Sequence, residues 1–425
     1  MEDSINQDNP KEATGFKLIF RALRHHNFQL FFGGQSISLV GTWMQRIAMQ
    51  WLVYRLTGSV FLLGIVGFTG ELPVFLLSPV AGVLCDRYNR HRFLILTQTM
   101  AMIQALILAF LVMTGTIQVW HIIILSIFLG VINVFDMPVR QSLLIDMIEK
   151  RDDLGNAIAL NSSMVNAARL IGPSIAGILI ATVGEGLCFL INGISYIAVI
   201  VALFAMKLPH KAIKRQTNNI LTELKEGFTY TFGFPPMRSI LLLLAVVSLM
   251  GWPYQVLMPV FAKDILKSGP ETLGFLMGAT GLGALIGAVS LAARKKVQGL
   301  PKIIILAAGI FGSGLIIFSL SRIFIFSLFL MLIVGFGMMV QMASSNTVLQ
   351  TIVADDKRGR VMSFYTMAFR GMTPFGSLFV GALADKIGAP NTLAISGTLC
   401  ILGAILFARQ ISIAENELHR RYVGI

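Results

Sequence analysis

The chain has little charge and few of the groups that catalyse reactions or bind metals. Only 13% of its 425 residues are charged, and it contains three cysteines and six histidines. The cysteines, Cys85, Cys188 and Cys400, lie far apart without metal-ligand spacing, so we expect buried, reduced thiols. The sequence also lacks a usable HExxH, nucleophile-elbow or phosphate-loop motif. We therefore predict that the protein is not an enzyme and needs no metal or cofactor.

Long polar stretches are also scarce, because 55% of the residues are hydrophobic and the mean hydropathy is +0.77. Apolar runs of about 18 residues or more are long enough to cross a bilayer as helices. Such runs occupy residues 28–54, 60–85, 92–114, 118–144, 155–183, 186–206, 238–262, 272–293, 301–320, 323–348, 360–384 and 389–409. This pattern excludes a soluble globular protein and predicts an all-α membrane protein with twelve transmembrane helices.

Acidic residues are outnumbered, with 21 Asp and Glu against 34 Lys and Arg, which gives a net charge of +13. Most of the basic residues fall in connections that share one side of the membrane with both termini. Because positively charged connections stay in the cytoplasm, we expect a multi-pass protein of the cell inner membrane with cytoplasmic termini. We interpret the surplus of positive charge as a signal that sets the orientation of the protein in the membrane. We therefore expect no nucleic-acid partner.

The two halves of the chain repeat each other. Arg169 precedes Pro173 by four residues, and Arg370 precedes Pro374 by the same interval six predicted helices later. A parallel repeat of this kind predicts two six-helix bundles related by an axis along the membrane normal. The predicted segments are a tail at 1–27, a bundle at 28–206, a linker with an interfacial helix at 207–237, a second bundle at 238–409 and a tail at 410–425.

The segment GVLCDRYNRHR, residues 82–92, places a glycine, an acid and several bases between two long apolar helices. Charged groups of this kind do not serve the packing of an apolar core. The spacing of Gly82, Asp86, Arg87 and Arg90 resembles the G-x-x-x-D-R-x-x-R-[RK] signature loop of the major facilitator superfamily. The resemblance implies an alternating-access transporter of that fold, in which this signature loop gates the cytoplasmic side.

The resemblance also implies partners for the signature loop. Asp86 would face the start of helix eleven, where exposed backbone amides favour an anion. Arg90 would reach an acid at the inner end of helix four, for which Asp146 is the best candidate, and the resulting latch would hold only while the cytoplasmic side is closed. The chain departs from the family pattern at 291–302, where a second copy of the loop lacks its acid. The segment GALADKIG at 381–388 looks like the signature but falls at the outer end of helix eleven.

Three stretches narrow the resemblance within the superfamily. Residues 63–87, 135–163 and 358–385 are similar to the branch that contains siderophore exporters of the enterobactin type and macrolide efflux pumps. The branch implies export of a small organic molecule, and it leaves the substrate open.

Six charged side chains stand well inside the predicted spans, where each costs about 2.5–3.5 kcal/mol to insert. They are Arg46, Glu71, Asp136, Arg140, Arg169 and Arg370. Glu71 is the first candidate for a proton carrier, because no base lies within one helical turn of it in the sequence. Asp136 is the second candidate, although Arg140 shares its helix face and the pair can equally serve to join helices.

Several polar side chains are candidates for a substrate cavity, since the resemblance implies that helices one, four, seven and ten line it. The candidates are Arg46, Arg140, Arg169, Arg370, Gln255, Gln341 and Asn346. Arg169 and Arg370, each four residues before a proline, can contact substrate or hold a gate. The basic surplus in the cavity favours an anionic substrate with carboxylate or catechol groups.

Together these observations predict a secondary transporter, since no ATPase motif is present and a gradient must supply the energy. We predict a proton-coupled exporter of a small organic molecule such as a siderophore, working as a monomer in the lipid bilayer with protons as co-substrate. The alternatives are drug or macrolide efflux and lysophospholipid movement. From a different class, a membrane receptor without transport activity also fits the sequence.

Overall fold

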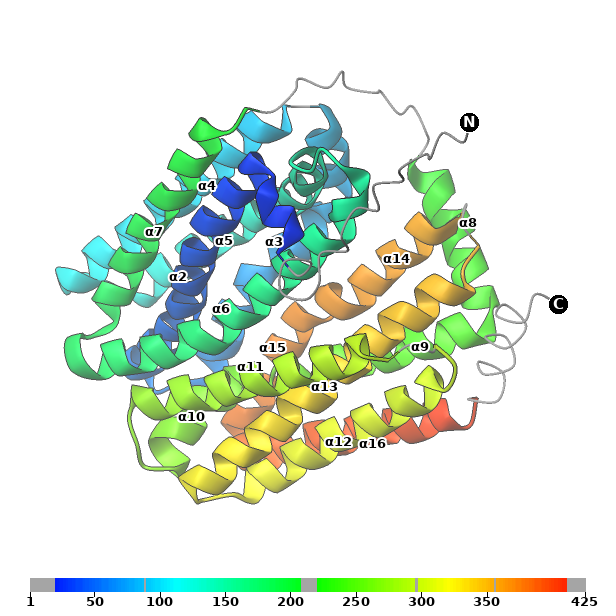
Figure 1. The fold of residues 1–425 in the computed structure, drawn as a ribbon. Helices are drawn as coiled ribbons and strands as arrows, with labels where there is room; N and C mark the ends of the chain where they lie inside the picture. The colour runs from blue at the N-terminus through cyan, green and yellow to red at the C-terminus, as the bar shows by residue number, and fades with distance from the viewer. Residues whose placement is uncertain (1–19, 88, 208–219, 295–296, 355–356, 411–425) are drawn as a thin grey trace, which may run out of the picture.

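The protein is described by a computed structural model that covers residues 20–87, 89–207, 220–294, 297–354 and 357–410; within these, the side chains of 79–87, 151 and 220–225 also lie outside the description. The described backbone is helical throughout and contains no strand. The helices form two bundles, one from each half of the chain (Figure 1).

The first bundle contains six long helices. They are α2 (His26–Thr57), α3 (Val60–Arg87), α4 (Arg90–Met113), α5 (Val119–Asp146), α6 (Leu154–Val183) and α7 (Glu185–Ala205). Short 3-10 turns, η1 (Arg21–Arg24) and η2 (Arg151–Asp153), precede α2 and α6. Because the connections are short, successive helices run antiparallel. After every second helix the chain is therefore back at the end of the bundle where it started.

The second bundle repeats this order with interruptions. Its first long segment consists of α9 (Pro235–Val246), η3 (Val247–Gly251), α10 (Tyr254–Val260) and η4 (Phe261–Ile265). It continues with α11 (Pro270–Ala292), α12 (Leu300–Leu320), α13 (Phe324–Ile352), α14 (Arg358–Thr366), η6 (Met367–Gly371), α15 (Thr373–Ile387) and α16 (Ala389–Ala408). The turns η3, η4 and η6 are π-helical, a feature that often marks functional sites.

The twelve predicted spans correspond to these elements. Ten described segments are long and apolar enough to cross a membrane. The other two spans are α2, which is rich in polar residues, and the broken segment from α14 to α15, which carries Arg370 in its π turn. The seventh and eleventh predicted spans, 238–262 and 360–384, are not continuous α-helices in the structure. The π turns η3 and η6 precede Pro253 and Pro374, which lack the backbone N–H of a regular helix.

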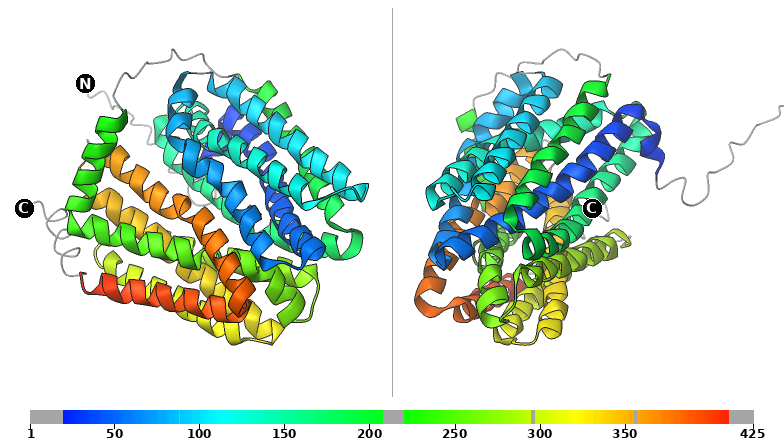
Figure 2. Two further views of the ribbon diagram at one scale, coloured as in Figure 1. Left: turned by 180° about the vertical axis from the view of Figure 1, so that it is seen from behind. Right: turned by 90° about the vertical axis from the view of Figure 1, so that its left-hand side faces the viewer.

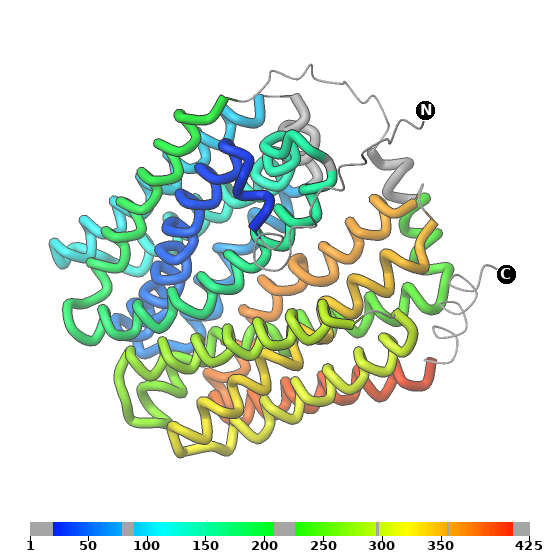
Figure 3. The backbone as a smooth tube through the Cα atoms, viewed as in Figure 1, coloured from blue at the N-terminus to red at the C-terminus, as the bar shows by residue number. Residues whose placement is uncertain are grey.

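The bundles meet at one end of the molecule. We call the end that carries η1 and the α8 helix (Ile220–Gly233) the linker end, and the opposite end the far end. Helix α3 packs on α15 and α6 packs on α11, and Figures 1 and 2 show the bundles spreading from the far end toward the linker end. A smooth trace of the chain shows the same arrangement (Figure 3).

Glycines allow the close approach at the far end. A Cβ on Gly64 of α3 would lie 2.7 Å from the Ser377 carbonyl oxygen and 3.1 Å from the Cα of Gly381. The second contact is similar, since a Cβ on Gly274 of α11 would lie 2.8 Å from the Cα of Gly177 on α6. Small residues thus let the backbones touch where larger side chains would hold the bundles apart.

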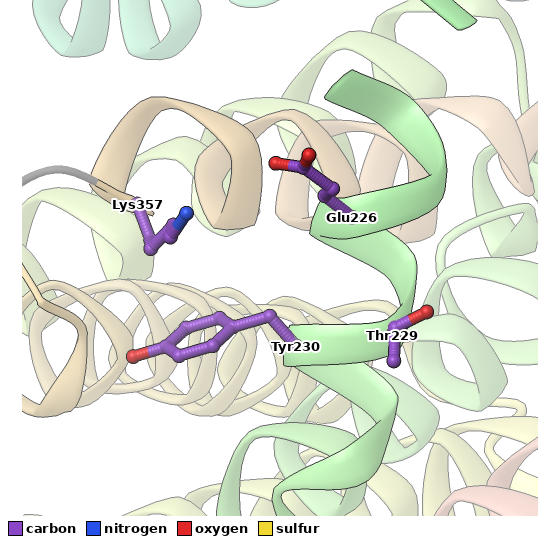
Figure 4. Close-up of a pocket in the computed structure, with 4 residues that line it drawn as sticks. All are labelled: Glu226, Thr229, Tyr230 and Lys357. Atoms are coloured by element: carbon purple, nitrogen blue, oxygen red, sulfur yellow. The ribbon is translucent and has the colours of Figure 1, made fainter. Parts of the chain in front are cut away.

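The linker helix α8 packs on the second bundle. Phe228 and Phe232, members of the apolar stripe expected of an interfacial helix, stack at 4.5 Å and both meet Phe364 of α14 edge-on. Phe228 stays half-exposed at 53%, so the helix also presents an apolar face outward. Beside this contact lies a surface cavity of about 460 Å³, lined by Glu226, Thr229, Tyr230 and Lys357 (Figure 4).

Candidate functional site

An ion pair joins α2 to α3 in the middle of the molecule. Arg46 donates from Nη2 to Glu71 Oε1 at 3.0 Å. The side chains keep 40% and 28% of their surface exposed although both stand mid-helix, so solvent reaches this point between the bundles. No base lies within one helical turn of Glu71 in the sequence, but Arg46 pairs with it from another helix. A neighbouring helix supplies the base that the local sequence does not.

A second arginine faces this pair from the other bundle. Arg370 lies in the π turn η6 and is within electrostatic range of both Glu71 and Arg46. The wider turn of a π helix places its side chain differently from that of Arg169, which stands in the continuous helix α6. The two arginines of the sequence repeat are thus not equivalent in the structure.

Arg169 is buried between two tryptophans. It is 8% exposed, and its Cζ lies 5.5 Å from the ring centroid of Trp43 and 5.4 Å from that of Trp252. Arg46 lies over the same Trp43 ring at 5.4 Å. Aromatic faces attract guanidinium groups, so these rings stabilise two cations that would otherwise repel each other.

Polar groups around Arg169 have no partner among the described residues. The Nη2 of Arg169, the hydroxyl of Tyr254 and the Nε2 of Gln255 are buried and make no hydrogen bond of good geometry to a described residue, although the Tyr254 hydroxyl lies near Arg169, Gln255 and Thr280. Tyr254 is fully buried, Gln255 is 5% exposed, and the Tyr254 side chain lies against Arg169 and Gln255. Such groups are costly to leave unpaired and call for an explanation.

Asp136, by contrast, has a full set of partners. Its Oδ1 accepts hydrogen bonds from Thr97 (3.0 Å) and Gln98 (2.5 Å) of α4, and its Oδ2 pairs with Arg140. The carboxylate is buried, and its partners belong to α4 and α5. This geometry favours the helix-joining role that the sequence left open for the Asp136–Arg140 pair.

Part of the predicted gate lies outside the described residues. The side chains of Gly82, Asp86 and Arg87 are not described, while Arg90 Nη1 lies 3.5 Å from Asp146 Oδ2, as expected. This pair joins α4 to α5 within the first bundle. This one contact does not by itself hold the two bundles together.

Two other predicted cavity residues turn toward their own helix. Gln341 is buried and donates to Ser345, and Asn346 accepts from Gln350. Among the described residues no group of histidine, cysteine and carboxylate side chains could hold a metal ion.

The sequence analysis missed a contact at the far end. Tyr54 of α2 hydrogen-bonds to Asp264 of η4, and Lys263 lies 5.5 Å from the Tyr54 ring centroid. These groups belong to different bundles. The only signal in the sequence was a charged pair, KD at 263–264, beside the end of a long apolar span.

Comparison with known proteins identifies the family. The family model described as transmembrane secretion effector, a branch of the major facilitator superfamily, matches residues 19–420. The chain belongs to this family. Its twelve-helix transporter fold, predicted from the signature loop and the repeat, is confirmed.

Curated relatives of this secretion-effector chain are exporters or transporters by name. The staphyloferrin A transporter of Staphylococcus aureus is 28% identical over 382 residues, covering 89% of this chain and 95% of that protein. The multidrug efflux pump Tap of Mycolicibacterium fortuitum is 24% identical, covering 84% and 90%. The macrolide efflux protein A of Streptococcus pyogenes is 22% identical, covering 90% and 96%. The chain is thus a transporter of the efflux type.

Solved structures support the fold alone. A bacterial homologue of the human lysosomal transporter Spinster, described as inward-facing and unoccupied, aligns with a TM-score of 0.66 at 12% identity, covering 96% of this chain and 99% of that one. A POT family transporter aligns with a TM-score of 0.72 at 12% identity, covering 91% and 96%.

Proposed function

We propose that the protein is a proton-coupled exporter of a small organic anion of the siderophore class in the cell inner membrane. The basic connections support a cytoplasmic position of the linker end. In that orientation the closed far end faces outward, and the molecule is in its inward-facing state. The proposed gate consists of Gly82, Asp86, Arg87 and Arg90 with Asp146.

The observation that carries the proposal is the charge balance at the centre. One carboxylate, Glu71, lies among three arginines: Arg46 in direct contact, and Arg370 and Arg169 nearby. A site with surplus positive charge and solvent access attracts anions. Similarity to the staphyloferrin A transporter supports the same substrate class.

Glu71 is the proposed proton carrier. Protonation removes the negative half of the pair that joins α2 to α3 and so changes the relative free energies of the two access states. Proton entry from the outside and release to the cytoplasm would then drive the carrier through its cycle. The Asp136 carboxylate, with partners on all sides, is less suited to this exchange.

The test uses inside-out membrane vesicles with an acidic interior, in which export appears as accumulation. We expect wild-type protein to accumulate staphyloferrin A and to lose accumulation when the pH gradient is collapsed. Glu71→Gln should abolish accumulation while exchange with preloaded staphyloferrin A continues, because a permanently neutral side chain mimics the proton-loaded carrier.

Glu185→Gln is the matched control, since Glu185 also pairs with an arginine of α2, Arg55, at 2.7 Å, but at the far end. It should accumulate staphyloferrin A as wild type does. Accumulation by Glu71→Gln at the wild-type rate would refute the coupling role. Accumulation of erythromycin in place of staphyloferrin A would refute the substrate class and favour macrolide efflux.

A further inference from the structure

The buried groups around Arg169 share one chemical property: each has a proton to donate. The free atoms are Arg169 Nη2, the Tyr254 hydroxyl and Gln255 Nε2. An unmet buried donor costs about 1–3 kcal/mol, and more when it is charged. The phenol oxygen of Tyr254 can accept one hydrogen bond from Arg169 or Gln255. The guanidinium and the amide still carry more N–H groups than this one oxygen can accept, so the remaining donors are costly unless a group that accepts several hydrogen bonds occupies the site during the transport cycle.

An ionised carboxylate has the required properties. It only accepts hydrogen bonds, it offers two oxygens, and a guanidinium can bind both of them at once. The tryptophans fix the direction of that guanidinium, because Arg169 lies between the faces of Trp43 and Trp252. Both rings are only partly buried, so the site borders the solvent-accessible centre of the molecule.

We propose that Arg169, Tyr254 and Gln255 form a subsite that binds a carboxylate group of the substrate. This proposal rests on the proposed export function, and it adds which chemical group of the substrate the transporter recognises. Arg169 belongs to α6 in the first bundle, and the other two residues belong to α10 in the second. A carboxylate bound there contacts both bundles and can respond to their relative movement.

Coupling to protons favours Arg169 over Arg46 as the anion's partner. An anion on Arg46 would compete with Glu71 for one guanidinium and would favour proton binding together with substrate, which is the linkage of cotransport. Arg169 makes no ion pair among the described residues, so an anion there can leave the Arg46–Glu71 contact intact. Binding of the anion at a separate site from the proton therefore avoids the positive linkage of cotransport.

The fluorescence of the tryptophans themselves can report binding. The chain has four tryptophans, and replacing Trp51 and Trp120 by phenylalanine leaves only Trp43 and Trp252, the two that contact Arg169. The purified full chain in detergent is titrated with tricarballylate, a tricarboxylate that does not absorb with tryptophan. The trimethyl ester of tricarballylate carries no charge and is titrated as the control ligand.

We expect a saturable fluorescence change with tricarballylate and none with the ester. Arg169→Gln should abolish the response, and Arg169→Lys should weaken binding about tenfold or more, because an ammonium group lacks the planar fork. Tyr254→Phe and Gln255→Leu should each weaken binding about tenfold, the loss expected for one hydrogen bond to a charged group. Arg55→Gln, at the far end, should bind as wild type does.

Two results would overturn the subsite: equal responses to acid and ester, or an unchanged response in the folded Arg169→Lys variant. A wild-type protein that responds to neither compound would also overturn it, because bound water would then satisfy the donors. Glu71→Gln separates this proposal from the proposed function. Normal tricarballylate binding with lost export in that variant supports both proposals. Normal export by the wild-type protein without discrimination between acid and ester rejects the subsite alone.

Discussion

At the scale of single residues, the partners of a buried charge decide what it can do. Asp136 and Glu71 are both acids inside membrane spans, yet Asp136 receives hydrogen bonds from Thr97 and Gln98 and pairs with Arg140. Within the described part of the chain Glu71 has one ion-pair partner, Arg46, with Arg370 in electrostatic range, and it is partly exposed. A carboxylate that exchanges protons needs access and a small number of partners, which describes Glu71.

Replacement of Asp136 by asparagine should destabilise the protein and leave the coupling machinery intact. It strands Arg140 in a buried position, and breaking one partner of a buried pair costs about 3–5 kcal/mol. The midpoint of thermal unfolding in detergent should fall clearly. The double variant Asp136→Asn, Arg140→Gln should recover most of the loss. A normal midpoint combined with lost pH-driven accumulation would make Asp136 the proton carrier.

At the scale of helices, glycine positions determine how closely the bundles approach. Gly64 on α3 and Gly381 on α15 face each other at backbone distance, and a Cβ on Gly381 would lie 2.8 Å from the Cα of Gly64. Helix α3 also carries Gly70, where a Cβ would meet only the Ser126 Cβ at 3.9 Å. Helix α3 thus contains one glycine in close backbone contact with α15 and one glycine with space for a methyl group.

Gly64→Ala should open the far end, and Gly70→Ala should not. The added methyl group at Gly64 overpacks the α3–α15 contact, at a cost of about 1–3 kcal/mol to the closed far end. Spin labels at Phe61 and Ile387, both partly exposed, can report the distance between these helices. We expect a longer distance in Gly64→Ala and the wild-type distance in Gly70→Ala. Identical distances in both variants would show that the glycine contact does not control closure.

At the scale of the whole molecule, polar contacts tie the two bundles at the far end. Tyr54 reaches Asp264 across the bundle boundary, and Lys263 lies over the Tyr54 ring. In the proposed orientation this is the outer gate, closed while the linker end is open. Its polar character suits a contact that must separate in each transport cycle, because water can replace its hydrogen bonds.

Tyr54→Phe should loosen this gate. The variant loses the hydrogen bond between Tyr54 and the charged Asp264, and a bond of this kind contributes about 1.5–3 kcal/mol. Asp264 is then less firmly positioned. Hydrogen–deuterium exchange at residues 261–270 should become faster. Tyr230→Phe removes a hydroxyl that accepts from the Ala354 backbone at the linker end, and it should leave exchange at 261–270 unchanged. Equal exchange in Tyr54→Phe and wild type would exclude a gating role for the contact.

The sequence by itself determined the class of the protein, the number of spans and the family. Apolar run lengths follow directly from bilayer thickness, and the signature loop from Gly82 to Arg92 is a local pattern. The same local reasoning identified the six charged residues well inside the predicted spans, because a charge in the middle of an apolar run is conspicuous whichever way it points. The family resemblance, and not the local pattern, implied the Arg90–Asp146 pair, which joins the ends of two successive helices.

Only the tertiary structure decided which of these charges meet. Arg46 faces Glu71 from another helix, and Arg169 meets Trp252 and Tyr254 across the boundary between bundles. Periodicity gives the face of a helix on which a residue lies but not its rotation against a neighbour from the other half of the chain. That rotation is set by backbone contacts such as Gly64 on Gly381 and by π turns such as η6, and neither leaves a signal in a single apolar span.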